Sequence, residues 1–336
     1  MAGADYLPFQ IRTVSTPNHS EDSIGELAEV EGLEVERHAA LSGYSTFRIG
    51  GPAEFLVQVH TQTALESLLS VTERLGLPFE LLGLGSNVLF PDEGLPGVVA
   101  RLAGDFVRFR FEGSRVTAGG GMALAKLARL AAEKGFEGLE SLAGFPSTVG
   151  GAVRMNAGSY GVEIKDVLVE TVVLERDRRV RHLTPDELQP AYRRTILRDS
   201  GGVVLSATFQ LQEGDAEKAL GRIAELNQRR RQSLPSGRPN VGSIFRNPPG
   251  DHAGRLIEAC GLKGAGCGDA QISPKHANVI VNQGKALALD VLELMLTARQ
   301  AVQERFGVEL VPEVELLGSL RTRWQDAVGS ESAPTG

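Results

Sequence analysis

The 336-residue chain is poor in cysteine. It has Cys260 and Cys267, with no CxxC and no paired histidine motif, so a disulfide framework and a metal site are both disfavoured. It also lacks an apolar run near the roughly 20 residues that span a bilayer, and its N-terminus lacks a basic flank followed by an apolar stretch. We therefore expect a cytoplasmic protein with no metal and no membrane insertion.

An excess of positive charge is missing as well. The formal net charge is −7, which argues against a broad surface for nucleic acid. The basic run QRRRQ at 228–232 is typical of a solvated helix end. With 42% hydrophobic and 23% charged residues, the composition is that of a globular protein with a sizeable core.

Hydrophobic spacing predicts a mixture of helices and strands. Strand patterns occupy 53–60, 78–83 and 167–211, and helical patterns occupy 63–75, 122–135, 252–261 and 290–306. Thr63 and Glu66 are spaced as in a capping box at the first of these helices. The chain becomes helical again after residue 215, so we expect at least two lobes, divided near residue 213.

Three glycine-rich turns carry the chemical signal: GLGSN at 83–87, AGGGM at 118–122, and AGFPSTVGGAVRMNAGSYG at 143–161. None has P-loop spacing. Val88 and Leu124 stand where a dinucleotide fingerprint would have its third Gly or Ala, which disfavours a Rossmann dehydrogenase. Each turn alone is consistent with a simple hairpin, but together they could surround a pyrophosphate with backbone N–H donors.

Six longer segments resemble the successive signatures of the UDP-N-acetylenolpyruvoylglucosamine reductase (MurB) family. They are TFRIGGPA (46–53), GLGSNVLFPDEG (83–94), GFPSTVGGAVRMNAGSYG (144–161), GSIFRNPPGDHAGRLIEACGLKG (242–264), KHANVIVN (275–282) and PEVELLG (312–318).

The resemblance implies a flavoenzyme of peptidoglycan precursor synthesis. NADPH would reduce UDP-N-acetylglucosamine enolpyruvate to UDP-N-acetylmuramate through noncovalent FAD. The implied fold is α+β, with a two-subdomain FAD-binding lobe of the PCMH/VAO type and a C-terminal α/β substrate-binding lobe. We expect a loosely ordered N-terminus (1–34), the FAD-binding domain (35–212, with a break near 105), the substrate-binding domain (213–322) and a disordered tail (323–336).

The resemblance also implies catalytic residues: Ser243 as proton donor, with Arg193 and Glu313 steadying an enolate-like intermediate. Taken by itself, Ser243 could merely cap a turn, and Arg193 could be a surface charge. Glu313 in an apolar segment must be paired, protonated or at a strand end. The chain has YRRT at 192–195 where the family commonly has Y-R-x-S, so Arg194 is an alternative to Arg193.

The expected contacts to ligands follow from the same motifs. For FAD they are Gly83, Leu84, Gly85, Ser86, Asn87, Gly144, Pro146, Thr148, Val149, Gly150, Gly151, Ala152, Asn156 and Gly158, with Leu84 where the family commonly has a glycine. For the sugar nucleotide they are Tyr192, Arg246, Asn247, Lys263 and Gln271. Two alternatives stay open: another flavoenzyme, such as an alcohol or sugar oxidase, and a noncatalytic nucleotide-sugar binding protein.

Overall fold

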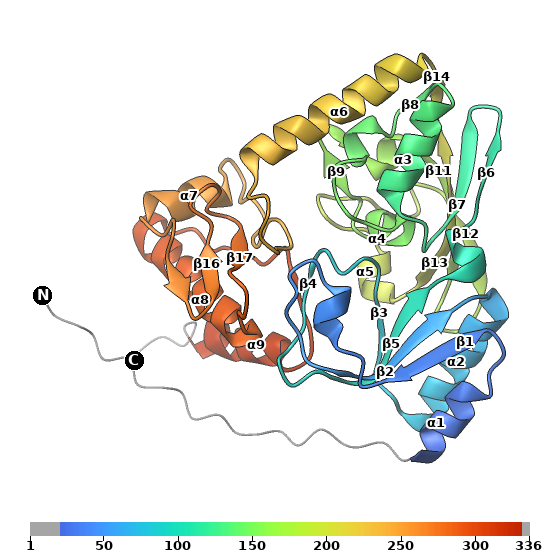
Figure 1. Cartoon of the computed structure of the whole chain (residues 1–336), viewed down its shortest axis with the longest axis horizontal. Coiled ribbons are helices and arrows are strands. Elements are labelled where there is room, and N and C mark those ends of the chain that lie inside the picture. The colour runs from blue at the N-terminus through green and yellow to red at the C-terminus, as the bar shows by residue number, and fades with distance from the viewer. Residues whose placement is uncertain (1–20, 331–336) are drawn as a thin grey trace, which may run out of the picture.

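The structure, a computed structural model, describes residues 21–330 (Figure 1), and their buried hydrophobic side chains form four clusters. Within these residues no helix is both long and apolar enough to cross a membrane. Most of the expected loose N-terminus and the last part of the expected tail, 1–20 and 331–336, lie outside the described residues.

The described parts of both ends differ from the expectation. Helix α1 (Glu21–Ala28) and the first two residues of strand β1 (Leu33–Arg37) fall within the segment expected to be loosely ordered, and Leu27 is fully buried in a core. Helix α9 (Ser319–Ser330) continues into the segment expected to be a disordered tail, and Trp324 packs against the C-terminal core. Few apolar side chains anchor each end, Leu27 and Leu33 at one and Leu320 and Trp324 at the other, and such a signal is weak in a polar sequence.

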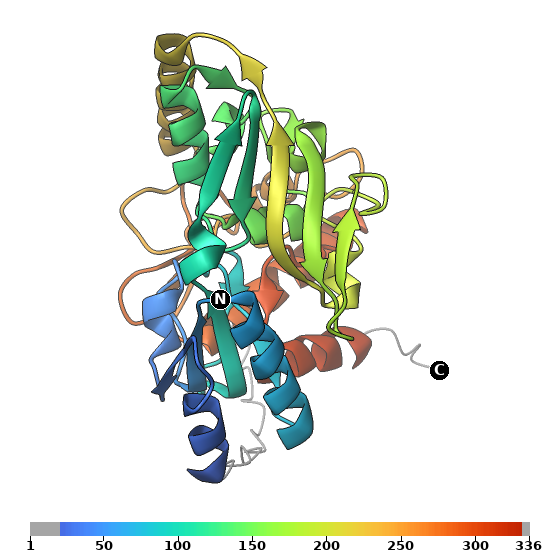
Figure 2. The same cartoon turned by 90° about the vertical axis from the view of Figure 1, so that its right-hand side faces the viewer.

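The first unit is a four-stranded sheet with the order β1-β2-β5-β3, covered by helices (Figures 1 and 2). β1 pairs antiparallel to β2, whereas β2 and β3 both run parallel to β5. The helix after β2 is capped by Thr61, whose hydroxyl accepts from the Ala64 N–H at 3.2 Å, so the capping box predicted from Thr63 is wrong. The remaining elements are β2 (Ala53–Val59), α2 (Gln62–Leu75), β3 (Phe79–Leu81), β4 (Val88–Leu89) and β5 (Leu95–Leu102).

The second unit is built on a five-stranded antiparallel sheet with the order β12-β11-β13-β7-β6 (Figure 2). Alternating buried residues on β13 place Ala207 and Phe209 in the core, as the sequence pattern predicted. Its elements are β6 (Phe109–Glu112), β7 (Arg115–Gly119), α3 (Leu124–Glu133), β8 (Phe136–Glu137), α4 (Val149–Arg154), β9 (Gly158–Ser159), β10 (Val162–Glu163), β11 (Leu168–Leu174), β12 (Val180–Leu183), α5 (Leu197–Ser200), β13 (Val203–Gln210) and β14 (Gln212–Glu213).

Helix α6 (Ala216–Ser233) connects the second unit to the C-terminal lobe (Figure 1). It packs against α3 of the second unit, and the C-terminal core gathers most of its residues from Val241 onward. The chain therefore leaves the second unit along α6, later than the expected break near 213. The C-terminal lobe contains α7 (Ala253–Ala259), β15 (Gly266–Cys267), β16 (Ala270–Ile272), β17 (Ile280–Asn282), α8 (Ala288–Phe306), β18 (Glu315–Leu316) and α9.

Two connections fasten the C-terminal lobe to the first unit. Strand β18 pairs in parallel with β4, with Glu315 opposite Val88 and Leu316 opposite Leu89. The Asp92 carboxylate accepts from the Ala288 and Leu289 N–H groups at 2.8 and 3.2 Å, and so caps α8 from the other lobe. These contacts hold the segment around residue 313 against the glycine turn at 83–87.

Candidate active site

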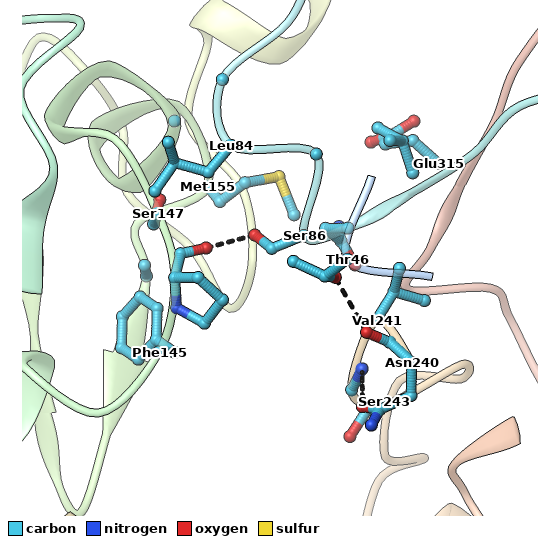
Figure 3. A pocket seen from close by; sticks show the side chains of 18 of the residues that line it. Thr46, Leu84, Ser86, Phe145, Ser147, Met155, Asn240, Val241, Ser243 and Glu315 are labelled. Carbon is cyan, nitrogen blue, oxygen red and sulfur yellow. Dashed lines mark hydrogen bonds between the residues drawn. The ribbon is translucent and has the colours of Figure 1, made fainter. Parts of the chain in front are cut away.

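A cavity of about 840 Å³ lies where the three units meet. Its walls come from the glycine turn 83–87, the loop 144–148, the end of α6 and the turn around Ser243. In Figure 3 the loop with Phe145 and Ser147 lies on one side, Asn240 and Ser243 lie on the other, and Ser86 lies between them. The cavity therefore collects residues from segments that are distant in the sequence.

The two glycine loops approach each other closely. A Cβ on Gly83 would lie 3.0 Å from Thr148 Oγ1, and one on Gly85 would lie 1.9 Å from the Tyr44 carbonyl oxygen, where φ is also +64°. The Ser86 hydroxyl donates to the Pro146 carbonyl and ties the loops together (Figure 3). At both positions the space that a Cβ would need is filled by the protein itself, so glycine lets the loops pack this closely. Their backbone lines the cavity, where N–H groups can face a pyrophosphate. These residues fit the FAD that the resemblance implies.

Ser243 lines the cavity from a turn that other residues hold in place. Gly242 precedes it at φ +78°, and its N–H donates to Asn240 Oδ1 at 3.0 Å. The Thr46 hydroxyl donates to the Asn240 carbonyl at 2.8 Å, which fixes the turn to the first unit (Figure 3). Among the residues that the structure describes, none forms a hydrogen bond with the Ser243 hydroxyl. That hydroxyl faces the cavity and caps no turn.

Glu313 and Arg193 form an ion pair in the wall of the same cavity. Arg193 Nε lies 2.8 Å from Glu313 Oε1, and their side chains are 24% and 14% exposed. The Glu313 N–H donates to the Ile244 carbonyl at 2.8 Å, so the pair lies beside the Ser243 turn. Burial raises the pKa of Glu313, and the Arg193 guanidinium opposes that shift. Of the three options that the sequence left for Glu313 (paired, protonated or at a strand end), the structure shows the carboxylate paired with Arg193.

The structure distinguishes the two adjacent arginines. Arg193 has φ +56°, uncommon for a residue with a side chain, and its Nη1 donates to the Gly158 carbonyl at 3.0 Å. Arg194 instead pairs with Asp199, and both of those side chains are more than half exposed. Arg193 therefore lines the cavity and Arg194 lies on the surface.

Further charged residues around the cavity were not predicted from the sequence. Arg198 Nη2 lies 2.7 Å from Glu315 Oε1, and Glu315 lines the cavity. Arg230 also lines it, and burial lowers the pKa of its guanidinium. The run 228–232 was interpreted as solvated, yet Arg230 lies on the inner face of α6. Helical spacing from the buried residues Ala219 and Leu226 could have indicated that face.

The structure brings many expected ligand contacts to this cavity and leaves others outside it. Those that line it are Gly83, Leu84, Gly85, Ser86, Asn87, Gly144, Pro146, Thr148, Gly151 and Gly158. Those absent from its lining are Val149, Gly150, Ala152, Asn156, Tyr192, Arg246, Asn247, Lys263 and Gln271.

Several residues outside the lining have structural contacts of their own. Asn156 is buried, and its side-chain amide donates to Glu163. Asn247 Oδ1 accepts from the Ala253 N–H at 3.1 Å at the start of α7. Lys263 pairs with Glu258 at 2.8 Å, and Gln271 donates to the Gly264 carbonyl at 3.1 Å.

Five of these residues remain. Gly150 donates its N–H to the Gly120 carbonyl at 2.8 Å, and the other four divide by burial. Val149 and Ala152 lie in the core of the second unit, while Tyr192 is 49% exposed beneath the Arg193 guanidinium. Arg246 has a buried Nε without a partner among the described residues, and burial lowers its pKa. Arg246 is therefore a half-buried cation, close enough to Glu313 to lower the pKa of that carboxyl.

Two known protein-family domains match this chain, one in the N-terminal part and one in the C-terminal lobe. Residues 53–184 match the FAD binding domain, and residues 234–317 match the C-terminal domain of UDP-N-acetylenolpyruvoylglucosamine reductase. The first match contains both glycine loops, and the second contains Ser243 and Glu313.

Whole-chain relatives agree with these matches. UDP-N-acetylenolpyruvoylglucosamine reductase 2 of Symbiobacterium thermophilum is 44% identical over 84% of this chain and 92% of its own length. The Bacillus subtilis (strain 168) reductase is 38% identical over 90% of this chain and its whole length. The crystal structure of the Thermus caldophilus reductase (MurB) superposes with a TM-score of 0.74 at 42% identity, covering 85% of this chain and all of that one. The chain belongs to the UDP-N-acetylenolpyruvoylglucosamine reductase family, whose members are FAD-dependent oxidoreductases of peptidoglycan synthesis.

Proposed function

We propose that this chain acts in the cytoplasm on UDP-N-acetylglucosamine enolpyruvate, and that Ser243, Arg193 and Glu313 direct its reduction to UDP-N-acetylmuramate. The observation that carries the proposal is the half-buried Arg193–Glu313 ion pair beside a serine whose hydroxyl has no partner among the described residues.

The glycine loops 83–87 and 144–151 would hold the FAD. When bound, FAD supplies a two-electron carrier that NADPH can reduce and that can reduce carbon later. The backbone of Gly83 and Gly85 gives close access, and the Ser86 contact to Pro146 keeps the two loops together.

Ser243 would supply the proton. Reduction of an enol ether conjugated to a carboxylate adds a hydride equivalent at the β-carbon and leaves a basic, enolate-like α-carbon. A serine hydroxyl is a weak acid, so it donates usefully only to such a strongly basic centre. The proton passes from Ser243 Oγ to the α-carbon, and the serine is then reprotonated from solvent.

Arg193 and Glu313 would stabilise charge during that transfer. The Arg193 guanidinium is a preorganised donor for the substrate carboxylate, onto which negative charge spreads before protonation. Glu313 holds that guanidinium through Nε, and the Gly158 carbonyl holds Nη1. Two fixed contacts leave the remaining N–H donors of Arg193 for the substrate.

The test is spectroscopic. Purified protein should be yellow, should bleach with NADPH under anaerobic conditions, and should recover its colour when UDP-N-acetylglucosamine enolpyruvate is added. A colourless protein that binds the sugar nucleotide would support the noncatalytic alternative. Recovery with oxygen but not with the sugar nucleotide would support an oxidase.

A further inference from the structure

A second hollow, of about 710 Å³, opens beside the main cavity. Its lining includes the loop 43–46 of the first unit, Gly237 at the start of the C-terminal lobe, and three arginines, Arg48, Arg101 and Arg238. Thr46, Leu84, Arg238 and Pro239 line both spaces, so a ligand could extend from one into the other.

The three arginines have no carboxylate partner among the described residues. Arg101 stacks over the Tyr44 ring at 5.1 Å, and its buried Nε has no hydrogen-bond partner in the described part of the chain. Arg238 Nη1 donates to the Gln283 carbonyl at 3.1 Å. Tyr44 donates to the Glu36 carboxylate at 3.4 Å, but Glu36 does not line the hollow. In a chain of net charge −7, this is a concentrated and uncompensated positive site.

The backbone also favours a functional role. Arg48 lies at φ +55°, in the left-handed region that residues with side chains seldom adopt. Its N–H donates to the Ser45 carbonyl at 3.1 Å, and its own carbonyl accepts from Asn282 at 3.4 Å. These contacts hold the strained residue with its side chain in the lining of the hollow.

We propose that Arg48, Arg101 and Arg238 bind the 2′-phosphate of NADPH. A phosphate monoester carries nearly two negative charges at neutral pH, because its second pKa is about 6. The diphosphates of FAD and of the sugar nucleotide carry one charge on each phosphate, so three guanidiniums match the monoester better. The assignment rests on the proposed function, since it takes NADPH to be the reductant.

The direct test is a binding measurement on the FAD-loaded protein. NADP+ is compared with NAD+ and UDP-N-acetylglucosamine, neither of which carries a phosphate monoester, by isothermal titration calorimetry, for the parent, Arg238→Gln, Arg48→Gln and Arg101→Gln. Loss of one charge-assisted contact should weaken NADP+ binding on the order of 10-fold and leave the other two probes nearly unchanged. The exposed Arg48 and Arg238 keep the test valid if Arg101→Gln folds poorly. Arg108→Gln is the matched control, since Arg108 is exposed and pairs with Asp105.

Rates of flavin reduction and reoxidation distinguish a failure of the 2′-phosphate assignment from a failure of the proposed function. Flavin reduction by NADPH should slow in all three arginine variants. In Arg48→Gln and Arg101→Gln, whose residues line the second hollow but not the main cavity, reduction by NADH and reoxidation by the sugar nucleotide should stay at the parental rate. Equal losses for NADPH and NADH, or weaker binding of NAD+ or UDP-N-acetylglucosamine by the same factor, would overturn the 2′-phosphate assignment. Failure of the parent protein to reoxidise with the sugar nucleotide would instead contradict the proposed function.

Discussion

Arg193 and Arg194 are adjacent in the chain but have opposite surroundings. Arg193 is paired with the half-buried Glu313, whereas Arg194 pairs with the exposed Asp199. We therefore expect Arg193→Ala to lower turnover by about 100- to 1000-fold, the usual cost of removing one preorganised donor, and Arg194→Ala to change it little. Steady-state turnover of both variants tests this. The opposite ranking would show that Arg194 contacts the substrate.

Glu313 should control the acid side of the activity profile. Because burial raises its pKa, the carboxyl should become protonated, and release Arg193, at a pH above the ordinary range of a glutamate. Reoxidation of the flavin should therefore slow as pH falls through that raised pKa, and Glu313→Gln should be slow at every pH. Rate–pH profiles measure this, and an unchanged acid limb in Glu313→Gln would assign it to another group.

Glu313 should affect the free energy of unfolding in the opposite pH direction to its effect on activity. A carboxyl whose pKa is raised in the folded state binds its proton more tightly there than in the unfolded chain. Its contribution to the free energy of unfolding is therefore fully present below the ordinary glutamate pKa and is lost as pH rises through the raised pKa. The activity of this residue and its stability contribution thus favour different pH ranges.

At the scale of elements, the cap of α8 is the clearest contact between lobes. Asp92 accepts two N–H bonds from the first turn of that helix. Asp92→Ala should lower the free energy of unfolding by about 0.5–2 kcal/mol, the typical range for a lost N-cap, in urea unfolding followed by circular dichroism. Asp105→Ala is a suitable control, because Asp105 pairs at the surface with Arg108. Equal stability of Asp92→Ala and the control would show that the cap contributes nothing.

Most elements could be predicted from hydrophobic spacing, because long periodic segments are decided locally. The helices ending at Gly76 and Phe306 and the strand through Phe209 lie where spacing placed them. The cap at Thr61 was missed because Thr63 offered an equally good motif two residues later. The C-terminal helix was missed because its polar sequence depends on Trp324 packing against a distant core.

At the scale of the whole molecule, two ion pairs join the second unit to the C-terminal lobe. Arg193–Glu313 and Arg198–Glu315 both connect the second unit to the C-terminal lobe, and the second pair is 22% and 28% exposed. A double-mutant cycle with Arg198→Gln and Glu315→Gln should give a coupling energy of about 0.5–3 kcal/mol. The exposed pair Arg194–Asp199 is the control and should give about 1 kcal/mol or less. Equal couplings would show that the second pair does not fasten the lobes.

The composition of the site was less predictable than the fold. Ser243, Glu313 and the glycine loops belong to long motifs, so a resemblance could identify them. Arg230 lies in a segment that carries no such motif, and Glu315 lies within PEVELLG but was not distinguished there from Glu313. Both line the cavity because α6 and β18 pack where they do, and Arg198 of α5 pairs with Glu315. Charge placement of this kind depends on tertiary contacts, which hydrophobic spacing does not encode.

The most direct test of the account is the rate of each half-reaction in Ser243→Ala. The variant should bind FAD and be reduced by NADPH at nearly the parental rate, since a proton donor to carbon has no part in that step. Reoxidation by UDP-N-acetylglucosamine enolpyruvate, followed by stopped-flow absorbance under anaerobic conditions, should be slower by about 100-fold or more. Reoxidation at the parental rate would contradict the assignment of Ser243 as the proton donor, and loss of both half-reactions would mean that Ser243 holds the site together.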